Sequence, residues 1–252
     1  MKKNKALNIR GTLLDRSQLT LYIEKTAAEH NVKTSSSKET YPMQLVRENY
    51  NYILETYKLL NKHIKLGIKV HSAGEWLLDN FYIIEETVKS IEKEMPLKKY
   101  KSMIGISSGR YQGFARSYVL AEEIVAYTDG KIDRDTIDLA LKAYQKKKFL
   151  SMDEICNIST FFKISMISHI REVCEKIYSS QIQKYKVESI IERVIDGKTG
   201  NDRVFKNISN VKVFSESELK YPFIEYMSYK LKLYGKKATD YQSVLEKDVL
   251  NA

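Results

Sequence analysis

The 252-residue chain has few residues that interrupt helices, with only 10 glycines and 3 prolines. Because glycine and proline punctuate regular structure, their scarcity favours long, unbroken elements, and hence helices. The chain has two cysteines, Cys156 and Cys174, and neither has a second thiol at the spacing of metal ligands. This pattern argues against a disulfide scaffold and against a structural zinc site.

Long apolar runs are also absent. No stretch approaches the roughly 18–20 residues that cross a bilayer as a helix. The basic start, Met1-Lys2-Lys3-Asn4-Lys5, is not followed by the apolar core of a secretory signal. We therefore expect a soluble, cytoplasmic chain.

The formal net charge is +10, and the cations are scattered apart from the run Lys146-Lys147-Lys148. A basic balance suits nucleic acid or an anionic membrane surface. The sequence has no zinc spacing, no aromatic RNA-binding signature and no basic helix with a zipper, so we do not expect nucleic acid as a partner. An anionic membrane surface remains a candidate partner.

Apolar residues recur at alternating steps of three and four along much of the chain, which predicts amphipathic helices. Four capping-box patterns precede such stripes, at Ser72-x-x-Glu75, Ser151-x-x-Glu154, Ser215-x-x-Glu218 and Thr239-x-x-Gln242. We expect helices at about Ser17–His30, from about Glu39 to Ile64, Ser72 to Met95, Ala115–Thr128, Asp133–Lys148, Ser151–Tyr178, Ile182–Asp196, Glu216–Tyr234 and Thr239–Leu250.

The predicted fold is all-α, an irregular multi-helix bundle of about eight to ten helices. The short link after Ile64 predicts an antiparallel hairpin of the second and third helices. We expect a flexible N-terminus at residues 1–10 and a single helical domain over residues 11–252, with a candidate subdivision near residues 197–212.

The segment from Glu75 to Phe81 contains the sole tryptophan, Trp76, and places Asp79 and Asn80 in the middle of a helix, where these side chains are poor helix formers. One interpretation is a contact with a sugar or a partner domain, because aromatic faces stack on sugars and polar groups bind hydroxyls. The other interpretation, which we favour, is a core tryptophan with Asp79 and Asn80 tying neighbouring helices together.

A second group, Arg110, Tyr111, Arg116 and Tyr118, surrounds a glycine-bearing loop that enters a helix. An arginine at this place can bind a carboxylate or a phosphate of a ligand. The interpretation that we favour is that it pairs with an internal acid and fixes the loop. Candidate partners are the acidic residues Asp79, Glu85 and Glu86.

The sequence offers no catalytic constellation. His169 and Glu172 stand three apart on one helix, but no second Glu-x-x-His supplies further metal ligands, so we expect no metal and no cofactor. The neighbours Glu122 and Glu123 point about 100° apart on a helix and cannot flank one scissile bond. The remaining histidines lie near helix ends, where we expect a cation suited to the helix dipole or an exposed site. We predict no enzymatic activity for this chain alone.

Several blocks of sequence resemble one known family. They are Gly11–Leu19 with Ala27–His30, Glu75–Phe81, Gly113–Ala121 with Val125–Asp129, Ala143–Gln145 with Leu150–Ile155, and Tyr229–Lys232 with Gly235–Ala238. These blocks, which spread over residues 11 to 250, resemble the N-terminal helical region of cyclic β-1,2-glucan synthases. The chain departs from that pattern at Ala115, Tyr127 and Cys156, where the family often has proline, histidine and tryptophan.

The resemblance implies a parent protein of the inner membrane with a glycosyltransferase that uses UDP-glucose. On this basis we expect a non-catalytic N-terminal accessory domain that contacts the transferase and membrane domains of the parent protein at the cytoplasmic face of the cell membrane. An alternative is an independent helical module that binds β-1,2-glucan or a protein, and a third is an enzyme in its own right. The candidate ligand or domain-contact residues are Trp76, Asp79, Asn80, Arg110, Tyr111, Arg116 and Tyr118.

Overall fold

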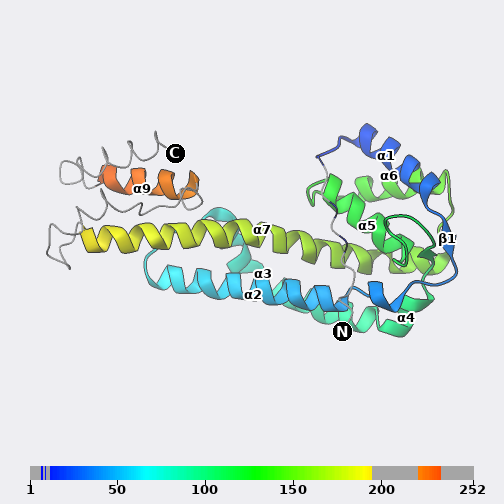
Figure 1. Cartoon of the computed structure of the whole chain (residues 1–252), viewed down its shortest axis with the longest axis horizontal. Helices are drawn as coiled ribbons and strands as arrows, with labels where there is room; N and C mark the ends of the chain where they lie inside the picture. The colour runs from blue at the N-terminus through cyan, green and yellow to red at the C-terminus, as the bar shows by residue number, and fades with distance from the viewer. Residues whose placement is uncertain (1–6, 8, 10–11, 195–220, 234–252) are drawn as a thin grey trace. The chain divides into compact units, whose positions relative to one another are not determined.

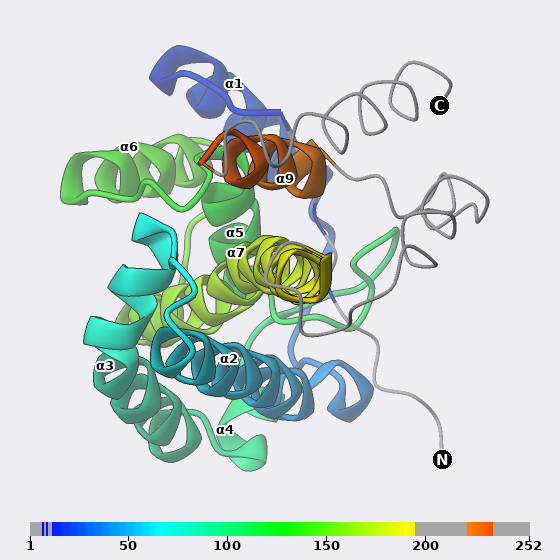
Figure 2. The same cartoon turned by 90° about the vertical axis from the view of Figure 1, so that its left-hand side faces the viewer.

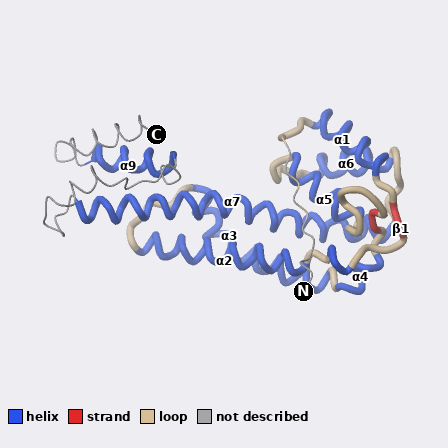
Figure 3. The backbone as a smooth tube through the Cα atoms, viewed as in Figure 1, coloured by secondary structure: helices blue, strands red, loops and turns tan. Residues whose placement is uncertain are grey.

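The computed structural model describes residues 7, 9, 12–194 and 221–233 of the chain (Figure 1). Within them are eight α-helices and one antiparallel pair of two-residue strands, which Figure 3 separates by colour. The predicted all-α fold is therefore confirmed. The elements are α1 (Arg16–Glu29), β1 (Val32–Lys33), the 3₁₀ helix η1 (Lys38–Thr40), α2 (Met43–Lys65), α3 (Ser72–Glu94), α4 (Leu97–Ser102), β2 (Gly105–Ile106), α5 (Arg116–Tyr127), α6 (Arg134–Gln145), α7 (Met152–Val194) and α9 (Tyr221–Leu233).

The chain divides into two compact units. Unit 1 comprises Met1–Glu55 and Asp79–Cys174, and unit 2 comprises Thr56–Leu78 and Glu175–Ala252. Helices α2, α3 and α7 each contribute residues to both units. The single domain predicted for residues 11–252 stays a prediction. The candidate subdivision near residues 197–212, the predicted last helix and most of the predicted flexible N-terminus lie outside the described residues.

Local capping decides where several helices begin. At α7, Glu154 Oε2 accepts from Ser151 N at 2.9 Å and Glu154 N lies 3.3 Å from Ser151 Oγ, so this predicted capping box is confirmed. At α3 the predicted box is wrong, because the helix already begins at Ser72 and the ring of His71 caps it. Helix α1 begins with a capping box at Asp15 that we did not predict. The other two predicted boxes lie outside the described residues.

Helix α7 is one element of 43 residues, where we predicted two. The polar residues after Tyr178 interrupt the apolar stripe, but in the structure they continue the helix. Gln181 is buried in unit 2, where its side chain lies 3.2 Å from His63 Nδ1 and 3.4 Å from the carbonyl oxygen of Lys69. Hydrogen bonding thus replaces apolar burial at this turn. In the described stretches no helix, α7 included, has the length and apolar character that crossing a bilayer requires.

Helices α2 and α3 make antiparallel contacts, as the predicted hairpin requires. In unit 1 the ring of Tyr50 stacks on that of Phe81 at a centroid distance of 6.1 Å. In unit 2 a Cβ atom built on Gly74 would lie 3.3 Å from Leu60 Cδ1, so the absent side chain allows close approach. Higher residue numbers on α2 therefore face lower numbers on α3.

Helix α5 lies at the centre of unit 1. Its residues from Arg116 to Val125 are all buried, including both polar and apolar side chains. Tyr118 stacks on Phe161 of α7 with ring centroids 5.7 Å apart, and Tyr22 of α1 bonds to Glu123 on another side of the helix. Helices α1 and α6 lie side by side in the same unit (Figure 2). The polar side chains of a helix that is buried on all sides need partners within the protein, because leaving them unpaired is costly. The candidate functional residues are among these side chains of α5.

Candidate functional site

Helix α3 carries the first group of predicted contact residues. Trp76 is 52% exposed, whereas its neighbour Leu77 is 1% exposed. Because successive helical residues point about 100° apart, Leu77 takes the core position and Trp76 faces outward. The interpretation of Trp76 as a core residue is therefore wrong. Asp79 is exposed and Asn80 is half-buried. Trp76 belongs to unit 2, and the other two residues belong to unit 1.

The second group of predicted residues divides between a loop and a helix. Arg110 and Tyr111 lie in the loop after β2, with the guanidinium carbon of Arg110 5.3 Å from the centre of the Tyr111 ring. This loop closes through Gly113, whose φ of +93° and crowded Cβ position require a residue without a side chain. Arg116 and Tyr118 lie on α5 and are 3% and 1% exposed. The four residues thus have different environments.

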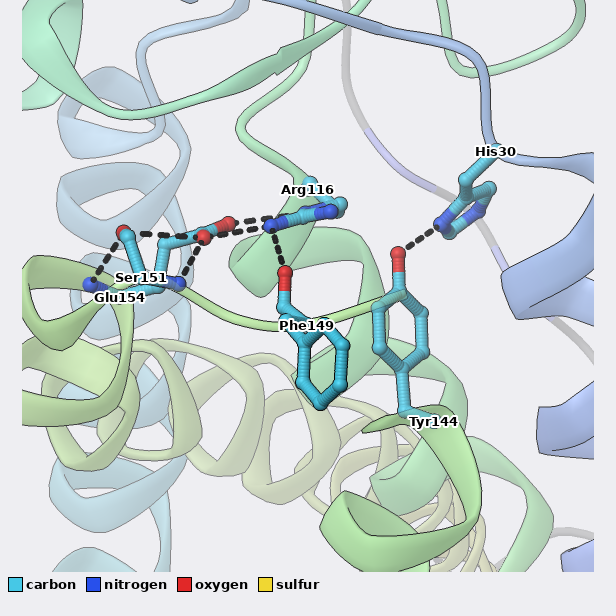
Figure 4. A network of polar contacts seen from close by, with 6 residues as sticks. All are labelled: His30, Arg116, Tyr144, Phe149, Ser151 and Glu154. Atoms are coloured by element: carbon cyan, nitrogen blue, oxygen red, sulfur yellow. Dashed lines mark hydrogen bonds and ion pairs between the residues drawn. The ribbon is translucent and has the colours of Figure 1, made fainter. Parts of the chain in front are cut away.

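Arg116 makes a buried, bidentate ion pair with Glu154 of α7 (Figure 4). Its Nε donates to Glu154 Oε1 at 2.9 Å and its Nη2 donates to Glu154 Oε2 at 2.6 Å. Nη2 also donates to the carbonyl oxygen of Phe149 at 3.0 Å. The partner of Arg116 is an acid of α7, not one of the α3 acids that we expected. The arginine fixes the segment between α6 and α7, as the interpretation that we favoured requires.

Next to this pair, His30 Nδ1 lies 2.9 Å from the hydroxyl oxygen of Tyr144 (Figure 4). Both side chains are buried. Burial, with the charges of Arg116 and Lys148, lowers the pKa of His30 to about 4, so the ring is neutral near pH 7. The expectation of a cationic or exposed histidine at this helix end is therefore wrong. Burial acts to lower the pKa of Arg116, but its bonds to Glu154 and nearby charge hold that pKa above its ordinary value.

Glu123 is buried on the side of α5 that meets α1. It is 1% exposed, and its Oε1 accepts from the hydroxyl of Tyr22 at 3.1 Å. Burial raises the pKa of Glu123 to about 7, although the hydroxyls of Tyr22 and Tyr111 and the charge of Arg110 act in the other direction. The carboxyl group thus sits in an aromatic environment, where the Tyr22 and Tyr127 ring centroids are 4.3 Å apart.

Glu122 faces a different side of α5 and lines a pocket of about 160 Å³ in unit 1. Glu122 is 8% exposed as a residue, and burial raises the pKa of its carboxyl group to about 7. The hydroxyls of Tyr118 and Ser165 oppose this shift, and the charge of Glu172 adds to it. The two adjacent glutamates therefore lie in separate environments, as the helical angle between them predicts. The pocket is lined by Ile9, Glu122, Val125, Ala126, Asp129, Ser165, Ser168, His169 and Glu172.

The turn after α5 contributes Asp129 to the lining of this pocket. Asp129 and Gly130 both have positive φ angles, of 51° and 70°, and the turn approaches His169 closely. A Cβ atom on Gly130 would lie 2.6 Å from His169 Cδ2, so only glycine fits. His169 Nε2 lies 3.9 Å from Asp129 Oδ1. The left-handed turn after α5 thus brings Asp129 close to His169 of α7.

The sequence pointed to His169 and Glu172 as a pair on one face of a helix, and the structure adds Glu122 and Asp129 to them. In the described part of the chain, no three histidine, cysteine or acidic side chains come together closely enough to hold a metal ion. Glu122 was missed because its role depends on a contact with Ser165, 43 residues away in sequence, which no local spacing reveals. The available signal was the pair Glu122 and Glu123 in the middle of a helix whose other residues after Ser117 are apolar or aromatic.

Comparisons with known proteins give a distant relative. No protein-family model matches the chain. The cyclic β-(1,2)-glucan synthase NdvB of Rhizobium meliloti (strain 1021) is 25% identical to the chain over 150 residues. The match covers 59% of this chain and 5% of that protein. This distant, partial match confirms the resemblance to the cyclic β-1,2-glucan synthase family.

Proposed function

We propose that this chain is a non-catalytic N-terminal accessory domain of a cyclic β-1,2-glucan synthase-like glycosyltransferase. In this role it packs against the transferase and membrane domains of the parent protein, at the cytoplasmic face of the cell membrane. The observation that carries the proposal is the match to a synthase over 59% of this chain and only 5% of that protein. A segment that is so small a share of a large synthase is suited to supporting its catalytic domains.

The interior of unit 1 fits a supporting role. The buried guanidinium group of Arg116 bonds to both carboxylate oxygens of Glu154 and to the carbonyl oxygen of Phe149. The hydroxyl of Ser36 donates to the carbonyl oxygen of Tyr100. The hydroxyl of Thr40 bonds to the hydroxyl of Tyr100 and to the carbonyl oxygen of Gly113. These bonds fix loops relative to helices, and so they create a defined surface for a neighbouring domain.

Unit 2 offers a surface suited to an anionic membrane. The C-terminal turn of α2 and the link that follows it expose three lysines, Lys62, Lys65 and Lys69. Between them, Ile64 is 53% exposed and Leu66 is 54% exposed. We call residues 62–69 the basic turn. Lysines flanking exposed apolar side chains are typical of segments that lie on anionic lipid, where each cation near the surface contributes about 1 kcal/mol.

Vesicle binding tests this surface. We expect the purified chain to sediment with vesicles containing phosphatidylserine at low salt and to remain in solution with neutral phosphatidylcholine vesicles. Replacing the three lysines of the basic turn by glutamine removes roughly 3 kcal/mol, about a 100-fold loss of affinity. The matched control replaces the exposed lysines Lys98, Lys101 and Lys142 of unit 1, which changes the net charge equally. Equal losses in both variants, or no binding by the parent chain, would contradict membrane contact through the basic turn.

The exposure of Trp76 favours a second candidate function, an independent module that binds β-1,2-glucan or a protein. A half-exposed tryptophan presents a flat apolar face on which a sugar ring can stack. Calorimetry with linear β-1,2-glucan tests this function directly. Because Trp76 is the sole tryptophan, its fluorescence reports on the same event without interference. No heat and no change of the Trp76 emission would exclude glucan as the ligand.

A further inference from the structure

We propose that the pocket between α5 and α7 in unit 1 binds a small organic cation, an aliphatic ammonium ion of about five or six non-hydrogen atoms, through the carboxylate of Glu122. This ligand site is independent of contact with a transferase or a membrane. The pocket combines buried polar atoms that make no well-aligned hydrogen bond among the described residues, a concentration of acidic groups and a short apolar wall.

Two buried polar atoms of the pocket lining make no well-aligned hydrogen bond among the described residues, although the hydroxyls of Tyr118 and Ser165 lie close enough to Glu122 to lower the pKa of its carboxyl group. The two atoms are Oε1 of Glu122 and Oγ of Ser165, in residues that are 8% and 0% exposed. A buried acceptor without a donor is destabilising, so native structures supply a partner from protein, water or ligand. An ammonium group brings up to three N–H donors, which suits a carboxylate and a hydroxyl that face one small space.

The charge of the pocket is opposite to that of the chain. Three acidic residues, Glu122, Asp129 and Glu172, line it, and no lysine or arginine is among the described lining residues. The chain as a whole has a formal net charge of +10. Burial raises the pKa of Glu122 to about 7, and the charge of Glu172 adds to this shift. A cation bound beside Glu122 would favour the ionised form of its carboxyl group.

The volume of the pocket and the chemistry of its lining limit which ligands it can hold. The pocket has a volume of about 160 Å³, close to the roughly 150 Å³ of an engineered protein cavity that binds benzene. Its apolar lining consists of Ile9, Val125 and Ala126, which suits a short hydrocarbon chain. A bare divalent ion suits it less, because among the described residues no three ligating side chains converge.

Calorimetric or NMR titration of the whole chain with n-butylammonium chloride tests the inference. We expect saturable binding with a dissociation constant of about 1 mM or tighter, and no binding of n-butanol, which has the same size without the charge. Glu122→Gln should weaken binding roughly 10- to 100-fold, because a charged hydrogen bond is lost. Ser165→Ala should weaken it less.

Glu123→Gln is the matched control. It changes the adjacent residue of the same helix, also a buried carboxyl with a raised pKa, but one that faces Tyr22. We expect it to bind butylammonium as the parent chain does, and far-ultraviolet circular dichroism checks the folding of all variants. Equal weakening by both glutamine variants, equal binding of butanol, or no binding to the folded parent chain would overturn the inference.

Discussion

Glu154→Gln is the substitution that tests the buried network most sharply. The side chain of Glu154 is 1% exposed and that of its partner Arg116 is 4% exposed. The two oxygens of Glu154 receive bonds from Nε and Nη2 of Arg116 and from the backbone and hydroxyl of Ser151. A glutamine has the same shape but only one acceptor oxygen, so it turns an N–H₂ group toward donors and leaves the guanidinium charge uncompensated.

The expected loss of unfolding free energy is about 3–5 kcal/mol, the range for breaking a buried pair by removing one partner. This is a large share of the roughly 5–15 kcal/mol that stabilises an ordinary domain. The double variant Arg116→Met with Glu154→Leu removes both charges and replaces them with apolar groups of similar size. It should therefore be more stable than Glu154→Gln.

Urea unfolding followed by far-ultraviolet circular dichroism measures these free energies. The control is Glu92→Gln, which breaks the exposed pair of Glu92 with Arg47, whose side chains are 40% and 67% exposed. Exposed pairs contribute at most about 1 kcal/mol. If Glu154→Gln loses no more stability than Glu92→Gln, the buried pair does not hold unit 1 together and our account of Arg116 is wrong.

Three further predictions follow from unit 1. The pKa of Glu122 rises from 4.5 to about 7 on folding. Its contribution to the free energy of unfolding is therefore fully present below about pH 4.5, and about 3 kcal/mol is lost as the pH rises through 7. Urea titrations at pH 4 and pH 8 should show that Glu122→Gln removes this loss, and an unchanged dependence of the unfolding free energy on pH would contradict the prediction. Gly130→Ala places a Cβ atom 2.6 Å from His169 at a positive φ and should destabilise the chain by about 1–3 kcal/mol; a melting temperature equal to that of the parent would refute this. Tyr144→Phe removes the hydrogen bond to buried His30 and should destabilise by about 1–2 kcal/mol in the same assay, whereas no change would mean that the bond contributes nothing.

The helices could be predicted from the sequence because their apolar period is local information. The same period passes through Leu77, Phe81 and Ile84 and leaves Trp76 off the apolar stripe, as the structure has it. The interpretation of Trp76 as a core residue followed the apolar character of its side chain and not this spacing. The apolar period also predicted an end of the helix before Ser179, because polar residues there interrupt the stripe. In the structure the helix continues, since Gln181 bonds to polar groups of other segments.

The candidate site could be predicted only in part, because local spacing contains no information on contacts between helices. His169 and Glu172 share one helix face, which spacing reveals. Glu122 completes the pocket from another helix, and Arg116 meets Glu154 at a separation of 38 residues. Such pairings depend on how helices pack, and a single sequence does not contain that information in local form.

The most direct measurement of the central claim uses the synthase of Rhizobium meliloti that the chain matches. Its matched region is deleted, or replaced by this chain, and the cyclic β-1,2-glucan made from UDP-glucose in membranes is quantified. We expect the deletion to abolish or strongly reduce glucan synthesis and the replacement to restore part of it, while the purified chain alone consumes no UDP-glucose. Undiminished synthesis after the deletion, or turnover of UDP-glucose by the isolated chain, would contradict a non-catalytic accessory role.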